Sequence, residues 1–198
     1  VRAVLVIIAA ALGTQWLACG WLTMTLDIKS PLITALSLSL LLRTESLATL
    51  ALAAIIAIGS KFLLRSHGRH IFNPANLAIA LFLISGYGWV SPGQWGSEAL
   101  LAFFFACLGL LVITRAHVAF LSMSFLTVYA TLLIGRGLWL GDPISIALHN
   151  LQSGALLLFA FFMLSDPKTT PHTQMGQLLF AASTALLAFI LNTQYYIT

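Results

Sequence analysis

Residues 70–97 read HIFNPANLAIALFLISGYGWVSPGQWGS and contain no Asp, Glu, Lys or Arg. An α-helix needs roughly 20 apolar residues to cross the hydrocarbon core of a bilayer, so this stretch is long enough for one crossing. Asn73-Pro74 predicts where the helix begins, because Asn caps helix starts and the fixed φ of proline suits the first turn. We therefore expect a membrane-spanning helix at about residues 75–90.

Charge-free stretches of similar length recur along the chain, at residues 3–26, 116–135, 143–165 and 169–198, with shorter ones at 30–42, 46–60 and 99–114. They predict an all-α integral membrane protein, one polytopic domain over residues 1–198 with a bundle of about eight transmembrane helices. The expected spans are 4–26, 31–42, 47–63, 75–90, 98–114, 117–135, 143–164 and 177–195.

The span at 31–42 is short for a crossing, and two explanations stay open. Ser30-Pro31, like Asp142-Pro143, can be an ordinary capped helix start. Alternatively, the short helix is discontinuous and ends inside the membrane, as in transporters built from inverted repeats.

Composition excludes several function classes. Charged residues make up 7% of the 198 residues and apolar residues 60%, whereas soluble domains carry about 25% and about 45–50%. The mean hydropathy is +1.01. A solvated catalytic domain is therefore excluded. The net charge of +4 does not indicate nucleic-acid binding, because the basic residues are scattered rather than gathered on one face.

The distribution of Lys and Arg predicts the orientation in the membrane. Alternating crossings place six basic residues on one side and three on the other, and the side richer in Lys and Arg faces the cytoplasm. We therefore expect a multi-pass protein of the cell inner (cytoplasmic) membrane with the 61–70 loop in the cytoplasm. The six are Lys29, Lys61, Arg65, Arg69, Arg115 and Lys168; the three are Arg2, Arg43 and Arg136.

Polar residues inside apolar stretches are candidate functional residues, because burying them in lipid is costly. His149 and Asn150 fall inside the span at 143–164. A hydrogen bond to a neighbouring helix explains them equally well, and both interpretations stay open. Cys19 and Cys107 are expected to be packing residues. No catalytic or metal-ligating set is predicted.

Two blocks of sequence carry the most specific information. The first runs from Lys61 through the basic loop to Phe72-Asn73-Pro74-Ala75-Asn76. The second runs from His149-Asn150-Leu151-Gln152-Ser153-Gly154-Ala155 to Phe161-Phe162-Met163-Leu164-Ser165-Asp166-Pro167-Lys168-Thr169. In this order the pattern resembles the NqrB/RnfD family of membrane subunits in Na⁺-pumping NADH:quinone oxidoreductases and Rnf complexes. The resemblance covers most of residues 31–171. It identifies the chain as a short, reduced member of the family.

The resemblance implies a urea-transporter-like helical bundle that holds flavin and passes electrons while Na⁺ or H⁺ moves. The residues expected to bind the cofactor are Phe72, Asn73, Pro74, Asn76, His149, Asn150, Ser153, Gly154 and Thr169. Of these, Phe72, Asn73, Pro74 and Thr169 match the motifs of the family by position. Asp166 is expected to be a cation or proton site, since a carboxylate at the membrane boundary can pair with either. Asn73 and Asp166 should lie on the same membrane face and could form one site.

The chain departs from the family in one respect. Family members carry FMN on the threonine of an S-G-A-T sequence, which the loop at residues 88–96 lacks; the Ser-Gly-Ala at 153–155 is followed by Leu156. We therefore expect no covalent FMN, but a non-covalent flavin (FMN or riboflavin) or quinone.

The expected function is that of a membrane subunit in a redox complex, with the lipid bilayer and other membrane subunits as partners. A solute or ion channel or transporter without cofactor, and a purely structural subunit, are the alternatives.

Overall fold

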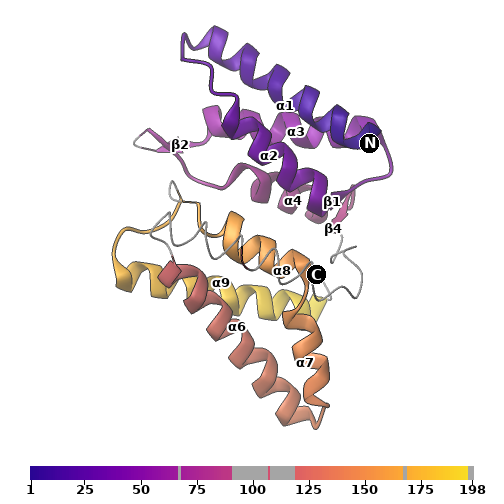
Figure 1. Ribbon diagram of the computed structural model, residues 1–198, viewed down its shortest axis with the longest axis vertical. Coiled ribbons are helices and arrows are strands. Elements are labelled where there is room, and N and C mark those ends of the chain that lie inside the picture. Colours follow the sequence, from indigo (N-terminus) through magenta and orange to yellow (C-terminus); the bar gives the residue numbers. More distant parts are fainter. Residues whose placement is uncertain (67, 91–106, 108–118, 167–168, 196–198) are drawn as a thin grey trace. The chain divides into compact units, whose positions relative to one another are not determined.

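The computed structural model describes residues 1–66, 68–90, 107, 119–166 and 169–195. The chain divides into two compact units, Val1–Ser91 and Pro92–Thr198. The described elements are helices apart from four two-residue strands (Figure 1). The predicted class, an all-α membrane protein, is confirmed. Its architecture as one urea-transporter-like domain of eight spans stays a prediction.

Unit 1 consists of four helices and two short antiparallel strand pairs. The helices are α1 (Arg2–Trp21), α2 (Lys29–Leu41), α3 (Leu47–Leu63) and α4 (Pro74–Ile84). Strand β1 (Leu42–Arg43) pairs with β4 (Trp89–Val90), and β2 (Arg65–Ser66) pairs with β3 (Arg69–His70). Helix α1 packs on α2 and α3, and α3 packs on α4.

Small side chains line the helix contacts of unit 1. Seven alanines on α1, α2, α3 and α4 have at most 3% of their surface exposed: Ala11, Ala35, Ala53, Ala54, Ala57, Ala75 and Ala78. Without a hydrophobic driving force between helices in lipid, small residues favour association because they let backbones approach closely. The unit is therefore held largely by close backbone packing.

Two helices of unit 1 end earlier than the sequence predicts. Helix α1 ends at Trp21 instead of residue 26, and Thr23 has a positive φ of 51°. Helix α4 ends at Ile84 instead of residue 90, and Gly86 follows with a φ of 74°. A Cβ on Gly88 would lie 3.0 Å from Leu42 Cδ1. The chain after α4 thus turns back against β1, a tertiary contact that hydropathy does not reveal.

Only one of the three predicted proline-linked caps is confirmed. Asn73 Oδ1 accepts hydrogen bonds from the backbone N–H groups of Ala75 (3.1 Å) and Asn76 (3.2 Å). The prediction for Ser30 is wrong, because α2 already begins at Lys29 and Ser30 lies within its first turn. The prediction for Asp142 is also wrong: α7 (Ile144–Leu151) has Pro143 at its N-cap position and no side-chain capping bond among the described residues.

The described part of unit 2 contains two long helices and a broken one. The long helices are α6 (Ala119–Leu140) and α9 (Gln174–Tyr195), which pack against each other. The broken one comprises α7, α8 (Gly154–Leu158) and the π-helical turn η1 (Phe159–Met163). Residues at helical spacing on α6 form the core with Ala181 and Ala185 of α9: Leu121, Phe125, Tyr129 and Leu133.

Within the described residues, three helices are long and apolar enough to cross a membrane: Arg2–Trp21, Ala119–Leu140 and Gln174–Thr193. The pair Ile144–Leu151 and Gly154–Met163 qualifies as one span with a 49° bend. The structure thus has a discontinuity in this span. The short 31–42 segment falls, up to Leu41, within one continuous helix, α2, and its ending inside the membrane stays a prediction. The predicted span at 98–114 lies outside the described residues, apart from residue 107.

Candidate functional site

The broken span of unit 2 is the first feature of the candidate site. Helix α7 ends at Leu151, and Gln152 N–H donates to the carbonyls of Leu148 and His149, both at 3.2 Å. Ser153 then takes an extended backbone conformation (ψ 125°), and α8 begins at Gly154. Of the predicted cofactor residues, Ser153 therefore lies in the break and Gly154 begins the helix that follows it.

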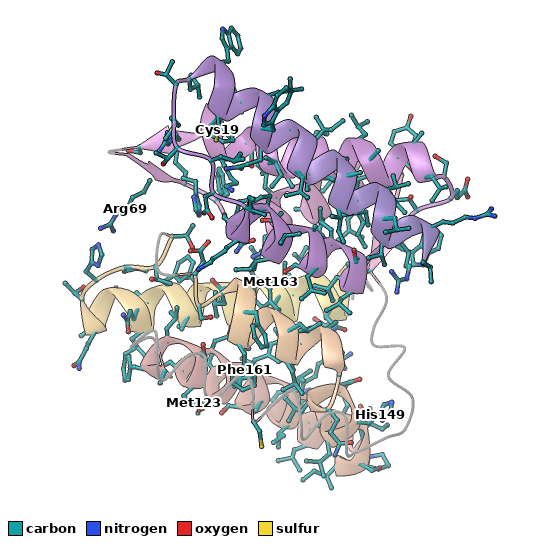
Figure 2. All side chains as sticks on the ribbon, turned by 45° about the horizontal axis from the view of Figure 1, so that its top comes forward. Cys19, Arg69, Met123, His149, Phe161 and Met163 are labelled. Atoms are coloured by element: carbon teal, nitrogen blue, oxygen red, sulfur yellow. The ribbon has the colours of Figure 1, made fainter. Side chains whose placement is uncertain are left out.

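A π-helical turn follows the break. The N–H of Leu164 donates to the carbonyl of Phe159 at 2.8 Å, five residues back instead of four. Hydroxyl groups donate to two carbonyls of this turn: Ser122 of α6 to Ala160 at 2.7 Å, and Ser165 to Phe161. Figure 2 shows Phe161 and Met163 on this segment. Such π-turns inside helices are frequent at functional sites.

The polypeptide turns at Asp166, where the second motif ends. The Asp166 carbonyl accepts the N–H groups of Thr169 (3.0 Å) and Thr170 (3.2 Å), and also the Thr169 hydroxyl (3.2 Å). Asp166 is partly buried. The Thr169 hydroxyl thus closes this turn.

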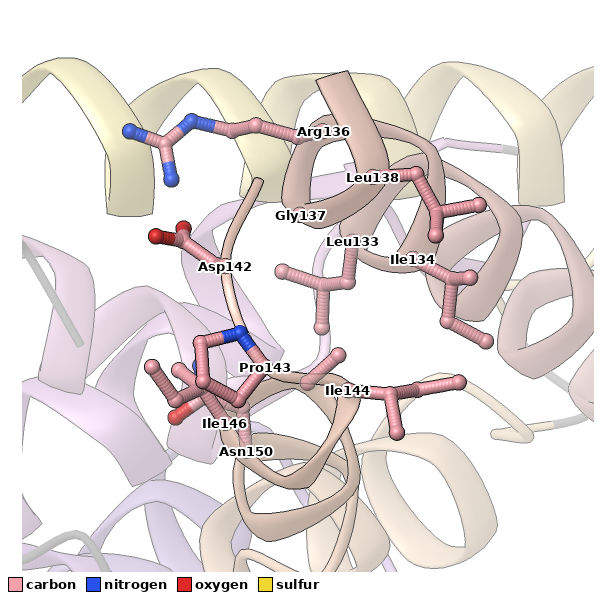
Figure 3. A pocket seen from close by; sticks show the side chains of 11 residues that line it. Leu133, Ile134, Arg136, Gly137, Leu138, Asp142, Pro143, Ile144, Ile146 and Asn150 are labelled. Carbon is pink, nitrogen blue, oxygen red and sulfur yellow. The ribbon is translucent and has the colours of Figure 1, made fainter. Parts of the chain in front are cut away.

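A small cavity of about 40 Å³ lies between the end of α6 and the start of α7. Its polar lining residues are Arg136, Asp142 and Asn150, and most of the rest of its wall is aliphatic. Figure 3 shows Arg136 and Asp142 on one side, with Ile134 and Leu138 on the other.

The structure separates the two members of the predicted His149–Asn150 pair. Asn150 lines the cavity, whereas His149 is not among its lining residues in the described part of the chain. His149 is exposed on α7 (Figure 2). Both side chains are exposed and Ala147 is the buried residue of α7, so neither His149 nor Asn150 is packed in the protein core, and their roles stay a prediction.

The first motif belongs to unit 1. Asn73 caps α4, Pro74 and Ala75 are buried, Asn76 is partly buried, and Phe72 is 52% exposed. Asn73 and Asp166 belong to different units, so their joint site stays a prediction.

Sequence reasoning missed a polar cluster inside unit 1. Lys61 Nζ donates to Ser30 Oγ at 2.8 Å and to Gln15 Oε1 at 3.2 Å. Gln15 is only 4% exposed, and its Nε2 lies 3.6 Å from Cys19 Sγ. Cys19 is buried, and Figure 2 shows it on α1. One signal was available: Gln15 is an amide in the middle of an apolar stretch.

Comparison with curated proteins finds similar chains that are named as subunits of an ion-translocating oxidoreductase complex. The relative from Cronobacter sakazakii is 31% identical over 131 residues, 64% of this chain and 35% of the relative. The relative from Escherichia fergusonii is 35% identical over 129 residues, which cover 64% of this chain and 34% of the relative. The relative from Sodalis glossinidius is 42% identical over 71 residues, which cover 34% of this chain and 20% of the relative. The matches thus span about a third or less of these relatives' length.

The sequence model of the NQR2, RnfD, RnfE family matches residues 86–196, more than half of the chain. This region contains the broken span, the π-helical turn and the turn at Asp166, whereas the Asn73 motif precedes it. The family resemblance seen in the second motif is confirmed, and the chain belongs to the NQR2, RnfD, RnfE family.

Proposed function

We propose that this protein is a membrane subunit of an electron-transfer complex, and that it binds a flavin or quinone non-covalently. Electron transfer would be coupled to Na⁺ or H⁺ movement, with other membrane subunits as partners. The observation that carries the proposal is the family match over residues 86–196, together with relatives named as subunits of ion-translocating oxidoreductase complexes.

The broken span supports a ligand site in unit 2. Non-helical backbone at membrane depth is tolerated where it is buried in protein or lines a cavity. Transporters use such discontinuous helices to build binding sites. The break at Gln152 and Ser153 is a discontinuity of this kind.

The chemistry of the adjacent cavity fits a flavin or quinone. Small-molecule sites are mostly apolar with a few placed polar groups, and this cavity of about 40 Å³ would have to widen to admit a ring of this size. Here aliphatic walls suit a planar ring, and the Arg136 guanidinium and Asn150 amide can donate hydrogen bonds to ring carbonyls. A bound flavin or quinone would supply the reversible electron acceptance that amino-acid side chains lack.

Asp166 is the proposed cation or proton site. Its backbone carbonyl closes the turn with Thr169 and Thr170, which fixes where the residue stands at the end of the broken span. A carboxylate at such a boundary can pair with a cation or accept a proton.

Visible absorption and cofactor extraction from the purified, assembled complex test the proposal. Asn150→Leu removes a polar group from the cavity wall, and His149→Leu on the neighbouring residue is the matched control. We expect the first variant to lose the flavin or quinone and the second to keep it. Full cofactor content in Asn150→Leu would refute the cavity as the binding site. Absence of any flavin or quinone from the wild-type complex would refute the redox role.

Asp166→Asn tests the coupling site separately. The substitution keeps size and hydrogen-bonding capacity but removes the charge. We expect the variant to assemble normally and to lose coupled Na⁺ or H⁺ transport in vesicles or bound cofactor. If it retains both in full, Asp166 has no such role.

The broken span also favours a second candidate function, a solute or ion channel or transporter without a redox cofactor. Flux of an ion or small neutral solute through vesicles containing cofactor-free protein would support this function. Flavin or quinone in the purified protein, without such flux, would argue against it.

A further inference from the structure

A basic hairpin follows helix α3 at one end of unit 1. It consists of the antiparallel strands β2 and β3, which contain Arg65 and Arg69. The N–H of Ile71 donates to the carbonyl of Leu64 at 3.1 Å, which extends the strand pair back to the end of α3. Residues 46–97 contain no Asp or Glu, so every Lys or Arg in this part of the sequence is without an acidic neighbour along the chain.

Neutral groups hold the guanidinium of Arg65 in place. Its Nη1 donates to the sulfur of Met24 at 3.8 Å, and its Nη2 donates to the carbonyl of Gly68 at 3.1 Å. Neither contact neutralises the charge, and the Arg65 side chain is exposed. A guanidinium has more N–H donors than these two contacts use, and its planar fork matches the oxygens of a phosphate.

Apolar side chains beside the hairpin indicate its depth in the membrane. Helix α3 has 17 residues and is therefore about 25 Å long, less than the about 30 Å thickness of the hydrocarbon core. Its last residue, Leu63, is 83% exposed, and Ile71 is 49% exposed. Such exposure is costly in water but not among acyl chains. We therefore expect Leu63 at the edge of the hydrocarbon core and Arg65, just beyond it, among the headgroups.

We propose that this hairpin binds an anionic phospholipid of the surrounding bilayer. Arg65 bonds the headgroup phosphate, and Leu63 and Ile71 contact the acyl chains. Basic residues next to a membrane-spanning segment attract anionic lipids, because the surface of such a leaflet has a negative potential. Phosphatidylcholine also carries a phosphate, but its choline group cancels the negative charge. The site therefore favours a lipid such as phosphatidylglycerol, and this role is independent of electron transfer.

Photochemical crosslinking of lipid to the full chain tests the proposal. The protein is reconstituted into phosphatidylcholine vesicles with a trace of phosphatidylglycerol or phosphatidylcholine that carries a photoactivatable acyl chain. Mass spectrometry then measures the yield of lipid crosslinked to residues 63–72. Arg65→Gln removes the charge. Arg43→Gln is the matched control, because the Arg43 guanidinium donates to the backbone carbonyls of Ser39 (2.7 Å) and Leu42 (3.3 Å) after the other end of α2.

We expect more phosphatidylglycerol than phosphatidylcholine on residues 63–72 of the wild type. Arg65→Gln should lower the phosphatidylglycerol yield about fivefold, the factor that one basic residue contributes near an anionic surface. Arg43→Gln should keep the yield of the wild type. An unchanged yield in Arg65→Gln, or an equal loss in Arg43→Gln, would overturn the proposal.

Two measurements on the wild type decide even if Arg65→Gln does not fold. Equal yields of the two lipids on residues 63–72 would show that the hairpin does not select an anionic lipid, and the proposal would be wrong. Inorganic phosphate, compared with chloride at equal ionic strength, should leave the phosphatidylglycerol yield unchanged. Loss of the crosslink in phosphate would assign the site to the free anion instead of the lipid.

Discussion

The hydrogen bond between Ser122 and the π-helical turn is expected to stabilise unit 2 measurably. Ser122 on α6 has none of its surface exposed, and its hydroxyl donates to the carbonyl of Ala160, which is also fully buried, at 2.7 Å. The rings of Phe125 and Phe159, with centroids 5.4 Å apart at 63°, pack across the same two segments. Ser122→Ala removes the hydroxyl while leaving these aromatic contacts.

The magnitude follows from the burial of both groups. A protein hydrogen bond contributes about 0.5–1.5 kcal/mol net, and interhelical bonds in membranes average about 0.6 kcal/mol. Because neither group is exposed, water does not readily replace the lost donor. We therefore expect Ser122→Ala to cost about 1 kcal/mol, which lowers Tm by about 2–4 °C for a chain of this size.

Thermal melting of the helical circular dichroism signal measures this effect. Thr131→Ala, on the same helix, is the matched control. The exposed Thr131 hydroxyl donates to the backbone carbonyl of Thr127 in its own helix at 2.8 Å. The control should melt at or slightly above wild type, because alanine has the higher helix propensity. If Ser122→Ala melts within about 1 °C of wild type, or Thr131→Ala loses as much, the reasoning about this bond is refuted.

Three further predictions concern the cap, the cofactor attachment and the topology. Asn73→Ala should lower stability by about 1 kcal/mol through loss of the two N-cap hydrogen bonds, while Asn73→Asp, which still caps, should preserve it in melting experiments. No flavin fluorescence should remain on the denatured chain in a gel, because the loop at 88–96 lacks the attachment threonine; a fluorescent band would contradict this and direct attention to Thr169 or Thr170. A cysteine at position 66 in place of Ser66, in a background without Cys19 and Cys107, should not react with a membrane-impermeant reagent applied outside intact cells. The reason is that the Lys and Arg distribution predicts a cytoplasmic loop here. Labelling from outside would show that the predicted orientation is wrong.

Hydropathy was sufficient to identify the class of fold. In lipid every backbone polar group must be satisfied within the protein, so long apolar runs have few solutions other than helices. The Asn73 cap was equally predictable, because Asn73, Ala75 and Asn76 are close neighbours in the chain. Ser37 and Ser39 donate to carbonyls four residues back, as expected for serines in an apolar helix.

Features that depend on contacts between segments were not predictable in this way. The early end of α4 depends on the close approach of Gly88 to Leu42. The break near Ser153 falls in a charge-free run of the sequence. Asn150 lines the cavity and His149 does not, because only one side of α7 faces α6. Local sequence does not encode these partners.

The amino-acid sequence by itself determined that this chain forms apolar helices, where most of them lie, and to which family it belongs. Only the tertiary structure decided what Lys61 does. In the sequence it is one basic residue at the end of a span, but folding brings it to Gln15 and Ser30, 46 and 31 residues away along the chain. The reason is physical: an ammonium group leaving water must find oxygens, and their position depends on how α1, α2 and α3 pack.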